Sequence, residues 1–338
     1  MNDSVNDSEN FFEYEDEICE KEELVKFGSI AIPVFFFVVI TLSLIGNILV
    51  LVLLAFYENL KSLTNIFILN LAISDLIFTT GLPFWAVYHI WGWVFPEILC
   101  KIVTFVFFTG FYSSILFLTM MTIYRYLAVV HPLYDLSTQK VSTGVVVSFL
   151  IWIISTGAAI PSLLYTSLIE IYHKDGSSWG CEYNTALCKN IAISQQNILF
   201  LVAFAVIGFC YIQILRRITR TRSPTKNRAV KLVFCIVAVF FVGWVPYNVV
   251  IFLRILADNL VEPFDDCRVS IQLDYAFYVC RFIAFSHCCL NPVFYVFVGV
   301  KFRSHLKSML HRLFNRQRLV EEQQQVRMQN LISHGSVY

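Results

Sequence analysis

Charged residues are scarce in this sequence. They make up only 14% of the 338 residues, whereas a soluble domain of this size carries about a quarter. Hydrophobic residues account for 57% of the chain, and the mean hydropathy is +0.67. This composition excludes a soluble globular protein. It predicts an integral membrane protein in which one bundle of spans uses the whole length.

The sequence also lacks the features of several functional classes. We find no metal-ligand cluster, no glycine-rich phosphate loop and no nucleophile–base pair, so an enzyme is not expected. An internal repeat and a pair of broken helices in the two halves are absent, which leaves a seven-span transporter as a remote alternative. The N-terminus has no early apolar core, so a cleavable signal peptide is not expected. A nucleic-acid partner is not expected either.

Seven apolar runs are long enough to cross a membrane, which takes about 20 helical residues. They lie at about 29–56, 64–89, 98–130, 142–168, 191–216, 229–257 and 271–298. A short helix near 300–313 should follow at the membrane surface, with Phe302, Leu306, Leu310 and Leu313 on its apolar face. The predicted fold is therefore all-α, a seven-transmembrane helix bundle with a cytoplasmic amphipathic helix.

Basic residues concentrate on one side of the predicted membrane. They follow spans one, three, five and seven, whereas the opposite segments are mixed or acidic. Because cytoplasmic segments are rich in Lys and Arg, we expect an extracellular N-terminus. Asn2 and Asn6 begin N-glycosylation motifs, which agrees with this orientation. The expected division is an acidic extracellular tail over 1–28, the bundle over 29–298, the amphipathic helix over 299–314 and a cytoplasmic tail over 315–338.

The ten cysteines fall into two groups. Cys19, Cys100, Cys181, Cys188 and Cys267 lie outside or at the outer membrane edge, where disulfides can form. Since five is an odd number, one of them should remain free or pair elsewhere, and the spacing leaves the connectivity open. The other five lie inside spans, where we expect them to act as small apolar residues.

Several spans contain polar residues that are costly in hydrocarbon. Asp75 needs partners, because a charge at the centre of a span costs about 2.5–3.5 kcal/mol. Asn47, Ser114 and Asn291 could hydrogen-bond to it or share a sodium ion with it. The alternative is a static set of helix-to-helix hydrogen bonds.

Three further motifs indicate moving parts. Pro246 should kink span six close to Trp244, which could then act as a lever; packing with an incidental kink is the alternative. The segment from Asn291 to Tyr295 places a second bend near the end of span seven. Arg125 at the inner end of span three could switch partners or simply extend to the cytoplasm.

In combination these residues resemble the rhodopsin-like G protein-coupled receptors. The pattern covers residues 29–313 and consists of Asn47, Asp75, Arg125, Trp152, Trp244-x-Pro246 and Asn291-Pro292-x-x-Tyr295. Within that class the chain resembles the chemokine receptors. The motifs that carry this resemblance are Leu82-Pro83-Phe84-Trp85-Ala86, Trp93-Val94-Phe95 before Cys100-Lys101, and the run Ala284–Pro292. Residues 58–71, 280–289 and 296–303 are similar to the XC type, the receptors of lymphotactin.

The resemblance implies partners. A lymphotactin-like chemokine would bind outside, and a heterotrimeric G protein of the inhibitory class would bind inside, for chemotaxis and calcium signalling. Arrestin is a further candidate partner, and membrane lipid surrounds the bundle. The implied disulfides are Cys100–Cys181 and Cys19–Cys267, which would leave Cys188 as the odd thiol. Tyr14, flanked by acids, would be a sulfation target.

The resemblance also implies three groups of functional residues. The ligand contacts would be Tyr14, Glu15, Asp16, Glu17, Trp85, Phe107, Glu182, Tyr247, Tyr278 and Arg281. The switch core would be Asn47, Asp75, Ser114, Trp244, Asn291 and Tyr295, with an allosteric sodium ion at Asp75 as the one candidate cofactor. The G-protein contacts would be Arg125, Tyr126, Tyr211, Arg216, Lys231 and Lys301.

Three positions depart from the common chemokine-receptor pattern. Tyr124 replaces the usual Asp before Arg125, which puts the ion pair of the inactive state in doubt. Ala203 replaces a proline of span five. Arg281 replaces a glutamate of span seven that meets the amine of the ligand. An atypical scavenging receptor, which internalises chemokine without G-protein activation, is therefore the nearest alternative.

Overall fold

The computed structural model describes residues 22–57, 62–131, 141–173, 176–220, 224–259, 261–264, 266–298, 304, 306–309 and 311. The predictions for Asn2, Asn6, Tyr14, Glu15, Asp16, Glu17, Cys19 and Lys301 lie outside these residues, as do those for the side chains of Lys231 and Tyr295.

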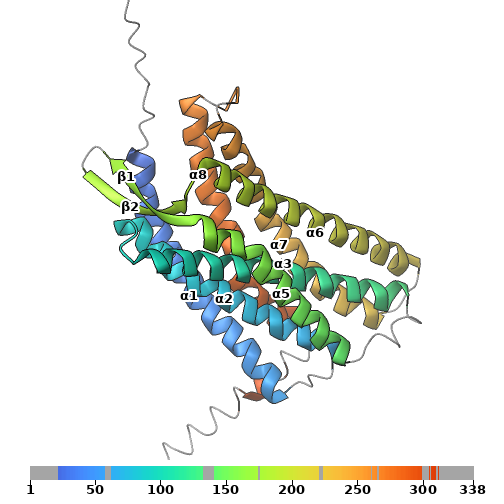
Figure 1. Ribbon diagram of the computed structural model, residues 1–338. Helices are drawn as coiled ribbons and strands as arrows, with labels where there is room; N and C mark the ends of the chain where they lie inside the picture. Colours follow the sequence, from blue (N-terminus) through green and yellow to red (C-terminus); the bar gives the residue numbers. More distant parts are fainter. Residues whose placement is uncertain are drawn as a thin grey trace, which may run out of the picture.

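The described chain is a bundle of long helices with one β-hairpin (Figure 1). The elements are α1 (Glu22–Tyr57), α2 (Leu63–Trp91), α3 (Glu97–Val130), α5 (Val141–Tyr165), β1 (Thr166–His173), β2 (Gly176–Tyr183), α6 (Ala186–Arg220), α7 (Pro224–Asp258), α8 (Cys267–Phe285) and α9 (His287–Val298). The helical bundle predicted from the sequence is confirmed. Six of the described helices are long and apolar enough to cross a membrane.

The seventh predicted span is interrupted, and it forms α8 and α9 on either side of Ser286. The Ser286 hydroxyl donates to the Ile283 carbonyl at 2.6 Å. Pro292 in α9 has no N–H, so the carbonyl of Cys288 is left without its helical donor. The side-chain amide of Asn47 in α1 donates to that carbonyl at 2.8 Å. The bend is therefore held by a contact between two helices.

The hairpin was not predicted from the sequence, which extended the fourth span to residue 168. Helix α5 instead ends at Tyr165, and β1 pairs antiparallel with β2, with Leu168 opposite Cys181. A disulfide joins Cys181 to Cys100 in the first turns of α3. The Trp93 N–H also donates to the Trp179 carbonyl at 2.7 Å. We call this end of the bundle the hairpin end, and the end at Val130 and Arg220 the opposite end.

Two glycines allow close helix contacts, Gly110 between α3 and α2 and Gly46 between α1 and α9. A Cβ atom at Gly110 in α3 would lie 2.5 Å from the backbone nitrogen of Phe78 in α2, so only glycine allows this approach. A Cβ at Gly46 would lie 2.9 Å from the ring of Pro292. These contacts fix the spacing of the helices that carry Asp75, Ser114 and Asn291.

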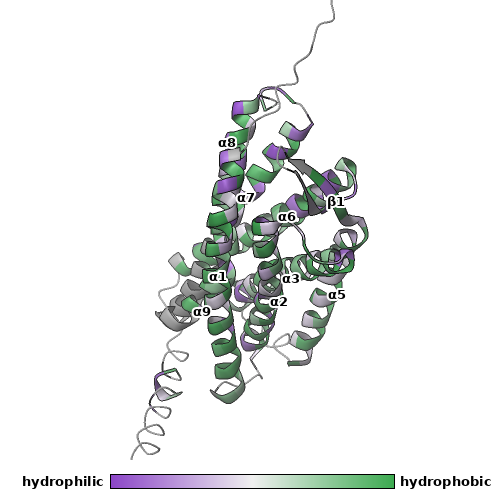
Figure 2. Ribbon diagram, turned by 90° about the vertical axis from the view of Figure 1, so that its left-hand side faces the viewer, coloured by the Kyte–Doolittle hydropathy of each residue, from purple (hydrophilic) through white to green (hydrophobic). Residues whose placement is uncertain are grey.

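Large apolar side chains cover the outside of the bundle. Phe37, Phe149 and Ile198 are 72%, 65% and 62% exposed. Figure 2 shows hydrophobic residues over most of α1 and α5, whereas hydrophilic ones appear along α8. A bundle with polar groups inside and apolar groups on its outer surface suits a lipid environment. The chain is a multi-pass membrane protein.

The predicted amphipathic helix is described only in part. Ser304, His311 and residues 306–309 are helical, and Leu306 and Met309 pack against the core. Phe302, Leu310 and Leu313 lie outside the described residues.

Candidate functional site

A cavity of about 1120 Å³ opens at the hairpin end. Residues of α1, α2, α3, α6, α7, α8 and both strands line it. All the ligand contacts predicted inside the bundle are among them: Trp85, Phe107, Glu182, Tyr247, Tyr278 and Arg281. The fold therefore brings together side chains that are nearly 200 positions apart in the sequence.

Aromatic rings form much of the cavity wall. Trp85 packs edge-on against Tyr88 and Phe107, with ring centroids 5.8 and 6.5 Å away. On the other side, Tyr247 packs against Phe277 at 5.8 Å and Phe285 at 6.1 Å. Rings of this kind give a site rigid apolar area for a ligand to cover.

Two ion pairs link neighbouring helices around the cavity. Arg254 of α7 lies 3.0 Å from Asp274 of α8, and Lys189 of α6 lies 2.5 Å from Asp258 of α7. These four lining residues were not predicted from the sequence. Charged residues near the ends of predicted spans were the available signal, but their pairing depends on how the helices are placed side by side.

The second strand places Glu182 over the cavity, immediately after disulfide-bonded Cys181. The carboxylate accepts a hydrogen bond from the Tyr88 hydroxyl at 3.2 Å. Burial raises the pKa of Glu182, although Lys189, Tyr88, Arg254 and Arg281 act in the opposite direction. The site thus holds an acid that takes up a proton more readily than an exposed glutamate does.

Arg281 enters the cavity from α8 and contacts α2. Its Nη2 lies 2.6 Å from Nε2 of His89, a neighbour that sequence reasoning missed. The guanidinium also lies over the ring of Phe277 at 5.3 Å and that of Phe36 at 5.4 Å. Hence Arg281 is held mainly by aromatic rings and an imidazole.

Asp75 lies in a polar core deeper in the bundle, and it is completely buried. Ser114 Oγ donates to its Oδ1 at 3.1 Å, and Asn291 Nδ2 donates to its Oδ2 at 2.8 Å. Nε2 of His287 lies 3.8 Å from Oδ1. The structure therefore brings together three predicted core residues and adds His287, which was not predicted as part of this core.

Asn47 belongs to the same core but bonds differently from the expectation. Its amide nitrogen donates to the carbonyls of Ser43 and Cys288, and Ser43 Oγ bonds to Thr79 Oγ1 at 2.7 Å. The buried Oδ1 of Asn47 has no hydrogen-bond partner among the described residues. Asp75 and Ser114 supply oxygen donors of the type that a small hard cation such as sodium prefers.

Trp244 lies between the cavity and the polar core. It is 1% exposed, and its ring packs 4.3 Å from Phe111 and 5.2 Å from His287. It also approaches Phe285, a cavity residue, at 6.0 Å. One turn of α7 that contains Pro246 therefore touches both regions.

At the opposite end, Arg125 donates to Thr64 of α2 at 3.0 Å. Tyr124, where an Asp is usual, packs its ring 5.2 Å from Phe67. Tyr126, which follows Arg125, has its hydroxyl 3.1 Å from Nε2 of His131, within hydrogen-bond distance.

Helices α6 and α7 contribute to the same end. Tyr211 is buried and packs 5.5 Å from Phe234, whereas Arg216 is exposed. Tyr126 of α3 packs 6.0 Å from Phe209 of α6. At the opposite end, α3, α6 and α7 thus meet where the G-protein contacts were predicted.

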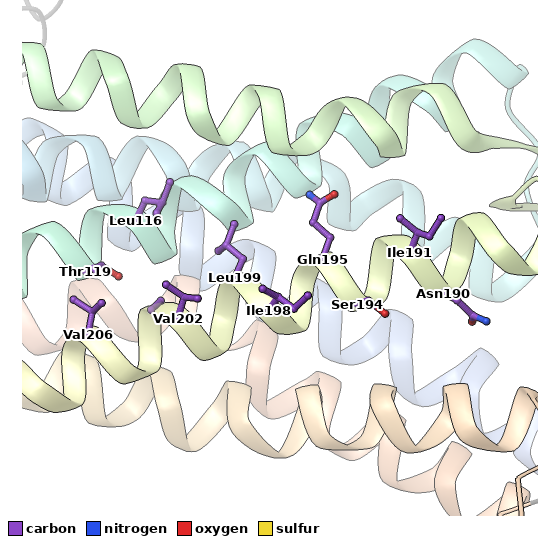
Figure 3. Close-up of a pocket in the computed structure, with 11 residues that line it drawn as sticks. Leu116, Thr119, Asn190, Ile191, Ser194, Gln195, Ile198, Leu199, Val202 and Val206 are labelled. Carbon is purple, nitrogen blue, oxygen red and sulfur yellow. The ribbon is translucent and has the colours of Figure 1, made fainter.

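A separate groove of about 750 Å³ runs along α6 (Figure 3). Leu116 and Thr119 of α3 line it together with α6 residues such as Ile198 and Val202. None of its lining residues is charged, and none was predicted to contact a ligand. The cavity at the hairpin end is therefore the better candidate for a charged ligand.

Disulfides agree with the predicted framework where the chain is described. Cys100 pairs with Cys181, and Cys188 is free, as expected. Cys267 is also disulfide-bonded, while its predicted partner Cys19 lies outside the described residues.

The sequence was compared with known proteins. Residues 46–295 match the 7 transmembrane receptor (rhodopsin family). The chain is 44% identical to human Chemokine XC receptor 1 over 310 residues, which cover 91% of this chain and 90% of that protein. Identity is 41% with the mouse Chemokine XC receptor 1, over 90% of this chain and 91% of that one. It is 36% with human C-C chemokine receptor type 4, over 89% and 84%.

The chain belongs to the chemokine receptors of the rhodopsin family. It is therefore a receptor and not an enzyme. For this receptor, the cavity at the hairpin end and the polar core around Asp75 are the regions to which a function can be assigned.

Proposed function

We propose that this receptor binds a chemokine of the lymphotactin type at the hairpin end and activates a heterotrimeric G protein of the inhibitory class at the opposite end. The observation that carries the proposal is the continuous connection from the charged cavity through Trp244 to the Asp75 core. The similarity to Chemokine XC receptor 1 supports the lymphotactin type.

In this proposal the hairpin end faces the outside of a cell at the plasma membrane, and the N-terminus is extracellular. The Cys100–Cys181 disulfide supports that orientation, because disulfides persist in oxidising compartments. The acidic N-terminal residues around Tyr14 would attract a basic chemokine electrostatically. Sulfation of Tyr14 would add negative charge there.

Ligand binding would change the equilibrium between two arrangements of the bundle. A ligand shifts such an equilibrium only by its difference in affinity for the two states. Contacts at Tyr247 and Arg281 would reach Trp244 through Phe285, and α7 can bend at Pro246. A sodium ion held by Asp75 and Ser114 would supply positive charge in the core.

A panel of chemokines, including lymphotactin, applied to cells that express the receptor would test the proposal. We expect lymphotactin to lower cyclic AMP and raise calcium, and we expect a toxin that blocks inhibitory G proteins to abolish both responses. Uptake of lymphotactin without either response would instead favour the atypical scavenging receptor. No binding of lymphotactin would contradict the XC-type assignment.

Arg125 offers a test of the coupling step. We expect Arg125→Ala to abolish G-protein activation while ligand affinity stays within about threefold of the wild type, since the residue lies far from the cavity. Arg217→Ala is a suitable comparison, because Arg217 is exposed at the same end and is not among the predicted G-protein contacts. Undiminished signalling of Arg125→Ala at matched surface expression would contradict this role.

A further inference from the structure

The cavity at the hairpin end contains two charges that form no ion pair with any described residue. Its charged lining residues are Glu182, Lys189, Arg254, Asp258, Asp274 and Arg281. The pairs Arg254–Asp274 and Lys189–Asp258 account for four of them. One negative group, Glu182, and one positive group, Arg281, remain.

Arg281 keeps most of its hydrogen-bonding capacity. A guanidinium has five N–H donors and no acceptor, so Nε2 of His89 must accept its bond, and the imidazole leaves the positive charge of Arg281 in place. The buried Nε of Arg281 has no hydrogen-bond partner among the described residues. The rings of Phe36, Phe277, Tyr278 and Phe285 lie within 5.9 Å of its carbon Cζ.

These rings stabilise the cation in part, because a guanidinium over an aromatic face is attracted to it. They offer no lone pairs to the unused donors. A carboxylate matches the planar fork of an arginine with two parallel hydrogen bonds. Arg281 is thus arranged to receive an acidic group from outside the described chain.

Glu182 shows the complementary situation on the hairpin. The hydroxyl of Tyr88 is its one hydrogen-bond donor among the described side chains, whereas a carboxylate can accept about four such bonds. Tyr88 and His89 are adjacent in α2, so the partners of Glu182 and Arg281 lie side by side along the chain. The two charges therefore face one cavity from neighbouring positions on its wall.

This inference rests on the proposed function. We propose that Glu182 and Arg281 divide the recognition of the chemokine's N-terminal segment: Glu182 binds its α-amine, and Arg281 binds the carboxylate of an acidic side chain that follows in that segment. The amine does not approach Arg281, since two like charges in a site shielded from water repel each other strongly. The arginine at this position then selects ligands with an acidic residue near the N-terminus, and it is a specificity-determining residue.

Binding of modified lymphotactin to the full-length receptor tests this assignment. One ligand has every Asp and Glu ahead of its first cysteine changed to Asn or Gln, and a second is acetylated at its α-amine. Each is measured on the wild type and on Glu182→Gln, Arg281→Gln and Arg254→Gln, all at matched surface expression. Arg254→Gln is the control, because Arg254 lines the same cavity but is paired with Asp274.

We expect loss of the ligand carboxylates to weaken binding to the wild type about 30-fold or more, and to have little effect on Arg281→Gln. Loss of the ligand carboxylates should weaken binding to Arg254→Gln and Glu182→Gln by the same factor as it weakens binding to the wild type. Acetylation should weaken binding to every receptor except Glu182→Gln. Arg281→Lys should show an intermediate dependence on the carboxylates, since it keeps the charge and loses the fork.

The inference would be overturned if the losses of affinity were additive. In that case removal of the ligand carboxylates would weaken binding to Arg281→Gln as much as binding to the wild type. If Arg281→Gln does not reach the cell surface, Arg281→Lys takes its place. An affinity loss on Arg281→Lys equal to that on the wild type would then overturn the inference. Both results leave chemokine binding itself intact, so they do not affect the proposed function. If lymphotactin and every other chemokine of the panel failed to bind the wild type, both proposals would be overturned.

Discussion

The cavity at the hairpin end and the polar core around Asp75 accommodate polar groups in different ways. Both contain polar groups within a bundle whose outer surface is apolar. In the core, the oxygens of Asp75 accept hydrogen bonds from Ser114 and Asn291 on two other helices. In the cavity, Glu182 and Arg281 keep unused hydrogen-bonding capacity. The core is therefore largely satisfied by the chain itself, whereas the cavity is built to be completed by a ligand.

The difference predicts two kinds of mutational effect. Changes in the core should alter stability and the balance of receptor states, because they leave buried hydrogen-bond donors without an acceptor. The helices that carry these donors pack tightly at Gly110 and Gly46. Changes in the cavity should alter ligand affinity with little effect on folding.

Removing the disulfide should have the largest effect, because Cys100–Cys181 holds the strand that carries Glu182 over the cavity. We expect the double change Cys100→Ser and Cys181→Ser to abolish specific ligand binding at the cell surface. Cys188→Ser is the control, since Cys188 is a free thiol near the same end, and its binding should match the wild type. High-affinity binding by the double variant would show that the hairpin needs no covalent tether.

Asp75→Ala should be next in size. Asn291 and Ser114 would lose their acceptor in a fully buried site, which costs about 1–3 kcal/mol for an unsatisfied group. Thermal inactivation of the purified receptor should therefore begin at a lower temperature. Asp75→Asn keeps one acceptor oxygen, so its inactivation temperature should fall by less than that of Asp75→Ala. Equal stability of the two variants would contradict the view that the core satisfies itself.

Acidification should weaken ligand binding by a smaller amount. Burial raises the pKa of Glu182, so this carboxylate becomes neutral at a higher pH than an exposed glutamate. The α-amine of the ligand stays protonated as the pH falls. Affinity should therefore fall with pH in the wild type. Glu182→Gln should lose this part of the pH dependence, and an identical pH profile would argue against the role of Glu182.

The smallest effect is expected for the ion pair between α7 and α8. The Arg254 side chain is 33% exposed and that of Asp274 only 11%, so solvent screens the pair from the arginine side, and we expect it to contribute about 1 kcal/mol. Arg254→Gln and Asp274→Asn should each change ligand affinity by less than about fivefold, and the double variant should resemble either single one. A loss as large as that of Arg281→Gln would mean that this pair also binds ligand.

The class of the protein follows from its sequence alone. Long apolar runs, the distribution of Lys and Arg, and single polar residues such as Asp75 and Asn291 predicted a seven-span receptor, because hydrocarbon admits few alternatives to helices. The motifs around Trp85, Cys100 and Asn291 were enough to indicate the chemokine receptors. Local sequence could do this because each motif is a short continuous stretch of the chain.

Which polar groups meet depends on how the helices pack against one another. The contacts of Arg281 with His89, of Arg254 with Asp274 and of His287 with Asp75 join different helices. Their geometry depends on helix rotation and spacing, which close approaches such as that at Gly110 set. The hairpin was missed for a similar reason. Its strands are stabilised by pairing with each other and by the disulfide to α3, which a reading of span length does not include.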